Sequence, residues 1–147
     1  AAVLQDIQLE VGRLDFELNI QVAENLSIQG AESEIRAILH TLLVNAIEAQ
    51  QANQNTQAIE VKAYSEQNAF FVEVEDQGGG FEAQILAQLF NPHVSSKADG
   101  AGMGLYLAKR LAELYYKGDI QVQNTHNGAR VTLQLAQSSL EEGAVHD

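Results

Sequence analysis

The sequence lacks cysteine and tryptophan and has a single proline among its 147 residues. Without cysteine, a thiol nucleophile, a thiolate metal site and a disulfide are all excluded. Basic residues are also scarce, because twenty acidic residues outnumber eight lysines and arginines and give a net charge of −12. An acidic surface of this kind repels phosphate backbones, which argues against a nucleic-acid-binding protein. No hydrophobic run approaches the ~20 residues that cross a bilayer, and no leader peptide is evident, so we expect a cytoplasmic domain without direct membrane contact.

Hydrophobic residues recur at two periods, one typical of helices and one typical of strands. Helices are expected at residues 2–13, 32–52, 82–89 and 103–117. Alternation predicts strands at 15–22, 58–64, 69–75, 119–124 and 129–135, with a short extended piece at 26–29. The inward side of the last helix is expected to carry Leu105, Ala108, Leu111, Ala112 and Tyr115. Turn residues at 65–68 and 125–128 predict two hairpins, so the fold is α/β with a mostly antiparallel sheet of five or six strands and helices on one face.

A first glycine cluster follows the strand at 69–75, in the sequence VEDQGGGF (74–81). The strand delivers Asp76 to the end of the sheet, and Gly78 and Gly80 follow it in a D-x-G-x-G pattern. Backbone without Cβ atoms can approach a flat ligand closely beside the carboxylate. An acidic turn without a ligand is the alternative interpretation.

A second glycine cluster, DGAGMGL (99–105), opens the helix at 103–117. Free N–H groups at a helix N-terminus, with Gly100, Gly102 and Gly104 around them, are typical of an anion site. The cluster is neither a P-loop nor the dinucleotide-binding fingerprint, because both of those patterns need residues that are absent here. A flexible hinge with a helix cap is the alternative.

The helix at 32–52 carries a polar stripe beside its apolar one. Thr41, Asn45 and Glu48 lie four and three residues apart, so they share one side of the helix. The amide oxygen of an asparagine is a suitable ligand for Mg²⁺. An ordinary solvated helix face would look the same.

Four of the eight basic residues lie around the second glycine cluster, at Lys97, Lys109, Arg110 and Lys117. There they could offset the charge of a bound anion in this acidic protein. A cationic second half of an exposed helix is the alternative for the last three.

In this order and spacing, the elements resemble the ATP-binding catalytic domain of two-component sensor histidine kinases. That domain belongs to the superfamily of gyrase, heat-shock-90, histidine-kinase and MutL ATPases, and the similarity covers about residues 3–136. LHTLLVNAIEA (39–49) is similar to the N box, VEDQGGGF to the G1 box, LFNPHVSSK (89–97) to the F box region and GAGMGL (100–105) to the G2 box.

The resemblance implies a two-layer α/β sandwich of the Bergerat type over residues 1–136, with an ATP lid at about 88–103 and a polar tail at 137–147. ATP and Mg²⁺ are the ligands that it implies. Asn45 would bind Mg²⁺, and Asp76 would accept a hydrogen bond from the adenine amino group. Thr41 and Lys97 would complete the catalytic set with Asn45. The nucleotide contacts that it implies elsewhere are Gly78, Gly80, Lys97, Gly100, Gly102, Met103, Gly104, Leu105 and Thr132.

Several positions depart from the family's pattern, and His93 at the second aromatic position of the F box is one of them. Thr41 stands where histidine kinases usually carry a second asparagine and where the hydrolytic relatives carry a glutamate base. Glu48 stands where a basic residue often reaches the phosphates.

The phosphate-accepting histidine of such kinases lies on a separate helical dimerisation domain. None of the four histidines here (His40, His93, His126, His146) fits its motif. The resemblance therefore implies transfer of the γ-phosphoryl group to a histidine elsewhere in a homodimeric full-length protein, and then to a response regulator. An anti-sigma serine kinase, an ATP hydrolase and a nucleotide-sensing module without phosphotransfer remain open as alternatives.

Overall fold

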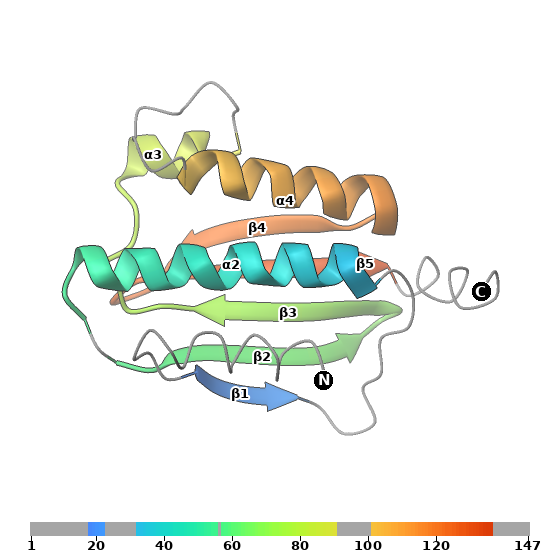
Figure 1. The fold of residues 1–147 in the computed structure, drawn as a ribbon, viewed down its shortest axis with the longest axis horizontal. Helices are drawn as coiled ribbons and strands as arrows, with labels where there is room; N and C mark the ends of the chain where they lie inside the picture. Colours follow the sequence, from blue (N-terminus) through green and yellow to red (C-terminus); the bar gives the residue numbers. More distant parts are fainter. Residues whose placement is uncertain (1–17, 23–31, 56, 91–100, 137–147) are drawn as a thin grey trace.

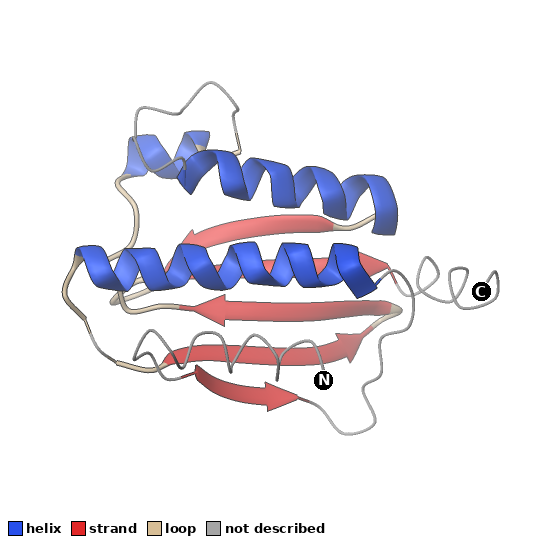
Figure 2. Ribbon diagram, in the orientation of Figure 1, coloured by secondary structure: helices blue, strands red, loops and turns tan. Residues whose placement is uncertain are grey.

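The computed structural model describes residues 18–22, 32–55, 57–90 and 101–136. Its strands form one five-stranded sheet, and its helices cover one face of that sheet (Figures 1 and 2). The strands are β1 (Leu18–Val22), β2 (Ile59–Glu66), β3 (Ala69–Glu75), β4 (Asp119–Asn124) and β5 (Ala129–Ala136). The helices are α2 (Glu32–Ala52), α3 (Ala83–Gln88) and α4 (Ala101–Tyr116). The predicted two-layer α/β architecture is thus confirmed.

The sheet has the strand order β1-β2-β3-β5-β4. Only the β1–β2 pair is parallel, and the pairs β2–β3, β3–β5 and β4–β5 are antiparallel. Both predicted hairpins are present, because β2 is joined to β3 and β4 to β5 by short turns. Since Glu75 pairs with Arg130, the last residue of β3 lies beside the start of β5 at one end of the sheet. The loop that leaves β3 therefore emerges beside the β4–β5 turn.

The hydrophobic core lies between the sheet and the two long helices. α2 contributes Ile35, Ile38, Leu39, Leu42, Leu43, Ala46 and Ile47. The strands contribute alternate residues, such as Ile59 and Val61 of β2 and Val131, Leu133 and Leu135 of β5. The period-two pattern thus places one face of each strand under the helices and leaves the other face open.

The inward side of α4 differs from the expectation at its end. Leu105, Ala108 and Ala112 are buried as predicted, but the fourth inward residue is Tyr116, whereas Tyr115 is 57% exposed and Leu111 only half-buried. The buried positions follow the spacing three, four and four, which keeps them over the sheet to the last residue of the helix. Placing Tyr115 inward was therefore wrong.

Several expectations lie outside the described residues. These are the helix at 2–13, the extended piece at 26–29, residues 91–100 of the proposed lid and the tail at 137–147. In the part of the chain that the structure describes, no helix combines the length and the apolar character needed to cross a membrane.

Candidate functional site

One side of α2 joins the three motif segments. Thr41, Asn45 and Ala49 are spaced four residues apart, so they follow this side over about 12 Å of the helix. At one end, Thr41 Cγ2 lies 3.4 Å from the position that a Cβ atom on Gly104 would occupy. At the other end, a Cβ atom on Gly78 would lie 2.7 Å from the carbonyl oxygen of Ala49. Asn45 therefore lies between the first turn of α4 and the loop that follows β3.

Asn45 has hydrogen-bonding capacity to spare. Its side chain is buried, with the residue 8% exposed, and its Nδ2 atom has no hydrogen-bond partner among the residues that the structure describes. A buried polar atom without a partner costs about 1–3 kcal/mol, which a ligand can recover. A carboxamide offers a neutral oxygen of the kind that Mg²⁺ accepts. The unpartnered atom is an N–H donor, which an anionic oxygen can satisfy and a metal ion cannot, so the metal-ligand position stays a prediction that rests on the carboxamide oxygen.

Asp76 is the most deeply buried acidic side chain among the described residues, with 1% of its surface exposed. Its backbone N–H donates to the carbonyl of Ala129 at 2.9 Å, and its Oδ1 accepts a hydrogen bond from the N–H of Gly78 at 2.9 Å. The backbone of Ala129 also interacts with the carboxyl group. Burial raises the pKa of Asp76, the hydrogen bonds at Gly78 and Ala129 partly offset this rise, and the neighbouring Glu75 adds to it. The site thus holds a buried carboxylate that backbone groups of the loop and of the β4–β5 hairpin hold in place.

Amide side chains at the end of α2 hold the loop after β3 from one side. The side chain of Gln50 is fully buried and accepts a hydrogen bond from the N–H of Gln77 at 2.9 Å. Asn55 donates to the carbonyl of the same Gln77 at 2.9 Å, and Asn53 donates to the carbonyl of Gly78. The polar side chains at the end of the helix therefore hydrogen-bond the backbone of the loop immediately beyond the buried aspartate.

The β4–β5 hairpin holds the loop from the other side. Asn124 accepts a hydrogen bond from the N–H of Phe81 at 2.9 Å and donates to its carbonyl at 2.9 Å. The N–H of Gly79 donates to the carbonyl of Asn127 at 2.9 Å. Gly80 lies against the same hairpin, where an added Cβ atom would be 2.8 Å from Asn124 Oδ1.

The four amide side chains that hold the loop from its two sides form one set. We call Gln50, Asn53, Asn55 and Asn124 the amide cradle. None of the four is predicted as a functional residue from the sequence, because they follow no periodic pattern.

The second glycine cluster is part of α4 rather than a loop before it. The helix begins at Ala101, two residues earlier than predicted, so Gly102, Met103 and Gly104 lie in its first turn. The N–H groups of a first helical turn have no partner within the helix and attract anions. Leu105 is a buried residue of the hydrophobic core. Lys97 and Gly100 lie outside the described residues.

Thr132 does not join the other predicted site residues. In β5 the residues Ala129, Val131 and Leu133 are buried under the helices, whereas Thr132 alternates with them and is half-buried. It pairs with Glu73 of β3 and therefore lies on the sheet face opposite the helices. Ala129, whose carbonyl bonds Asp76, is the residue of this strand that reaches the site.

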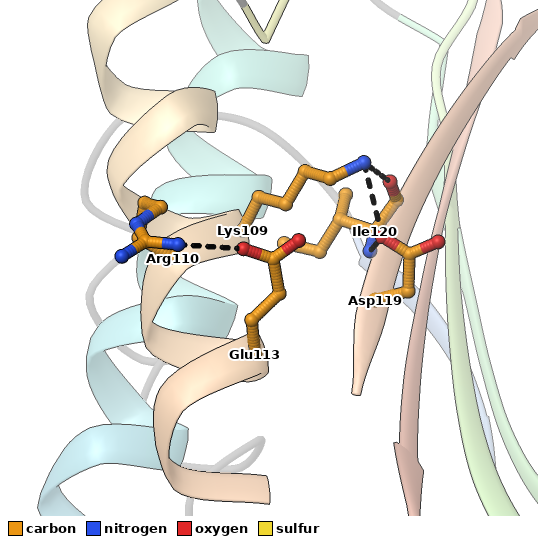
Figure 3. Close-up of polar contacts among 5 residues, drawn as sticks. All are labelled: Lys109, Arg110, Glu113, Asp119 and Ile120. Carbon is orange, nitrogen blue, oxygen red and sulfur yellow. Dashed lines mark hydrogen bonds and ion pairs between the residues drawn. The ribbon is translucent and has the colours of Figure 1, made fainter. Parts of the chain in front are cut away.

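The basic residues of α4 have acidic or aromatic neighbours of their own. Lys109 Nζ lies 3.0 Å from the carboxylate of Asp119 and 3.4 Å from the carbonyl of Ile120, on β4 (Figure 3). The same ammonium group lies 4.4 Å from the ring centroid of Phe90. Arg110 pairs with Glu113 at 3.2 Å along the exposed side of the helix (Figure 3). For these two residues the alternative, a cationic helix surface, describes the structure better than an anion site does.

Comparison with known proteins connects this geometry to a family. The model of the family described as "Histidine kinase-, DNA gyrase B-, and HSP90-like ATPase" matches residues 30–139. The chain is 30% identical over 124 residues to the C4-dicarboxylate transport sensor protein DctB of Rhizobium meliloti (strain 1021), a match that covers 84% of this chain and 20% of that protein. It is 33% identical over 134 residues to the sensor histidine kinase ZraS of Escherichia coli O157:H7, covering 90% of this chain and 28% of that protein. The chain thus spans less than a third of the length of either relative.

Solved structures share the fold at lower sequence identity. The catalytic domain of the histidine kinase ThkA, in a nucleotide-free form, superposes with a TM-score of 0.79 at 19% identity. The superposition covers 92% of this chain and 91% of that domain. The mixed five-stranded sheet with helices on one face is therefore the fold of a known catalytic domain.

Proposed function

Because the chain belongs to the histidine kinase-, DNA gyrase B- and HSP90-like ATPase family, we propose that it is the ATP-binding catalytic part of a sensor histidine kinase. The observation that carries this proposal is the single side of α2 that links Gly104, Asn45 and the loop of Asp76. A buried acceptor, an amide with spare capacity and the start of a helix lie in sequence along it. These three groups would contact, in order, the base, a metal-bound phosphate and further phosphate oxygens of a nucleotide.

Asp76 is proposed to select adenine. Its Oδ1 accepts a hydrogen bond from the N–H of Gly78, and the second carboxylate oxygen would accept one from the exocyclic amino group. Adenine carries that donor, whereas a purine with a carbonyl at the same position would set an acceptor against an acceptor. A hydrogen bond to a charged group contributes about 1.5–3 kcal/mol.

Asn45 is proposed to hold Mg²⁺, and the first turn of α4 to hold phosphate oxygens. Bound Mg²⁺ would supply charge neutralisation on the phosphates, which is the main demand of phosphoryl transfer. The N–H groups around Gly102 and Gly104 would donate to the phosphates, and Lys97 would add a positive charge. Through Gly104, the packing of α4 against Thr41 would fix these donors relative to Asn45.

The full-length protein would carry the remaining steps. We propose that the γ-phosphoryl group passes to a histidine on a dimerisation domain of the same protein, a homodimer, and then to an aspartate of a response regulator. The described domain would work in the cytoplasm. In this reaction the domain binds, orients and neutralises the nucleotide, and the acceptor groups lie on its partners.

Titration calorimetry with ATP, with and without Mg²⁺, tests the site. Asp76→Asn should weaken ATP binding about 10- to 150-fold, and Asn45→Ala should abolish the part of the affinity that depends on Mg²⁺. Gln51→Ala, an exposed position of α2, is the control and should bind as the wild type does. Unchanged affinity in the Asp76 variant would remove the adenine assignment, and metal dependence that survives in the Asn45 variant would place the metal ligand elsewhere.

A nucleotide-sensing module that transfers nothing is the second candidate. One observation favours it, because the hydroxyl of Thr41 donates to the carbonyl of Ala37 at 2.9 Å and so is engaged within the helix. Incubation of the full-length protein with ATP labelled in the γ-phosphate decides between the two. A labelled histidine supports the kinase, whereas tight ATP binding without any labelled residue supports the sensor. Labelled serine on an added partner, or release of phosphate alone, would point to the serine kinase or the hydrolase.

A further inference from the structure

The loop at 76–81 has a composition that favours disorder, yet it carries the residue on which adenine recognition depends. Three of its six residues are glycines, the residue type that loses most conformational freedom on folding. A carboxylate at the start of such a loop stays in one place only if the backbone beyond it is held. The structure supplies those restraints from outside the loop.

A first restraint acts on Gln77, the residue after Asp76. Its N–H donates to Gln50 Oε1 and its carbonyl accepts from Asn55 Nδ2, both at 2.9 Å. Gln50 is fully buried and uses its other end to donate to the carbonyl of Gln57 at 2.8 Å. Asn55 likewise accepts from the N–H of Gln57 at 2.8 Å. The side chains of Gln50, in α2, and Asn55, just after it, thus bind both the N–H and the carbonyl of Gln77.

A second restraint closes the far end of the loop. Asn124 binds both the N–H and the carbonyl of Phe81, again with two hydrogen bonds of 2.9 Å. Each end of the loop is therefore held by a pair of hydrogen bonds, one to the N–H and one to the carbonyl of a single residue. A pair of this kind fixes the orientation of the peptide as well as its position.

We infer that Gln50, Asn55 and Asn124 are positioning residues that hold the Asp76 loop in its adenine-binding geometry and so set the preference for adenine over other purines. The inference rests on the proposed function, because it assumes that Asp76 receives the adenine amino group. The three would act through the backbone of Gln77 and Phe81 and would not touch the base. Their loss should reduce discrimination between bases more than it reduces binding of the phosphates.

The test compares ADP with inosine diphosphate, which carries a carbonyl in place of the amino group. Both are titrated by calorimetry into the 147-residue chain with Mg²⁺. The variants are Asn124→Ala, Asn55→Ala and their combination, with Gln121→Ala as a matched control on β4. Gln121 is exposed, and no hydrogen bond joins its side chain to another described residue. The measured quantity is the ratio of the two dissociation constants.

Each single variant should lower the preference for ADP about 2- to 10-fold, the range expected for a lost neutral hydrogen bond. The double variant should lower it further, and the control should leave it unchanged. Asn124→Asp should retain part of the preference, because a carboxylate still accepts from the N–H of Phe81. Loss of folded protein lowers the active fraction equally for both nucleotides and leaves the ratio unchanged.

Failure of the inference and failure of the proposed function are distinguishable. If the wild type prefers ADP and Asp76→Asn abolishes that preference, while the cradle variants keep it, the positioning role is refuted and the function stands. If the double variant does not unfold cooperatively, Asn124→Ala at its exposed position still decides the question. If Asp76→Asn itself leaves the ratio unchanged, the proposed adenine site fails, and the positioning role fails with it.

Discussion

Replacing Asp76 with asparagine should separate the cost of burying a carboxylate from its use in binding. The side chain is 1% exposed, and burial raises its pKa, so the folded protein disfavours the charged form. Asparagine has the same shape and still offers an oxygen to the N–H of Gly78, but it carries no charge. The variant should therefore unfold, without nucleotide and at neutral pH, at a temperature equal to or above that of the wild type.

The sign of the pH dependence follows from linkage. Since the pKa of Asp76 is higher in the folded than in the unfolded chain, its protonation favours folding. This contribution is fully present below the ordinary value of 3.8 and is lost as the pH rises through the raised pKa. Any stability advantage of Asp76→Asn should thus be largest at neutral pH and should shrink as the pH falls toward 3.8. Thermal unfolding followed by circular dichroism measures this difference.

Binding should change in the opposite direction. At an ADP concentration of about 100 times the wild-type dissociation constant, the wild type gains about 2.7 kcal/mol of stability. A 100-fold weaker variant gains only about 0.4 kcal/mol at that concentration. The unfolding temperature of Asp76→Asn should therefore respond little to ADP. A variant that is clearly less stable without nucleotide would show that the carboxylate's hydrogen bonds outweigh its burial, and an undiminished response to ADP would refute its contact with adenine.

Two further substitutions test the packing around the site. Gly78→Ala should destabilise the domain by roughly 1–3 kcal/mol in urea unfolding, because the new Cβ atom would lie 2.7 Å from the backbone of Ala49. An unchanged free energy of unfolding would mean that the loop can move away from α2 at no cost. Lys109→Met should lower stability by about 1 kcal/mol, because it removes an ion pair with β4 and the contact with the Phe90 ring. Arg110→Met, in the exposed ion pair of the same helix, is the control and should change stability by less than about 0.5 kcal/mol. Equal effects of the two substitutions would contradict the stabilising role of the Lys109 contacts with Asp119 and Phe90.

The secondary structure was largely predictable because its signals are local and periodic. α2 was expected at residues 32–52 and spans Glu32–Ala52, since its apolar stripe repeats at the helical period over many turns. The two hairpins were predicted from turn residues between alternating runs. The parallel pairing of β1 with β2 and the strand order could not be derived in this way, because both depend on contacts between distant segments.

In the candidate site, the residues with distinctive chemistry were recognisable and those that hold them were not. Asp76 and Asn45 stand in motifs; Asn45 lies on the side of α2 that contacts Gly104 and Gly78, and Asp76 lies two residues before Gly78 in the loop. The cradle residues join side chains to backbone groups 22 to 43 positions away. Hydrogen bonds between such distant segments produce no regular spacing of residue types in the sequence. A run such as QQANQNTQ therefore looks like the polar end of any helix.

The D-x-G-x-G pattern has a reason in the protein as well as one in a ligand. A side chain at Gly78 would collide with α2, and Gly80 has a φ of 78° where it lies against the hairpin. The two glycines thus allow the loop to approach the two elements that bind it. Once the loop is in place, Gly78 itself donates to one oxygen of the aspartate, so the pattern also orients the carboxylate. A pattern that was expected to make room for a base therefore acts first by docking the loop, and the base would meet a carboxylate whose orientation is already fixed.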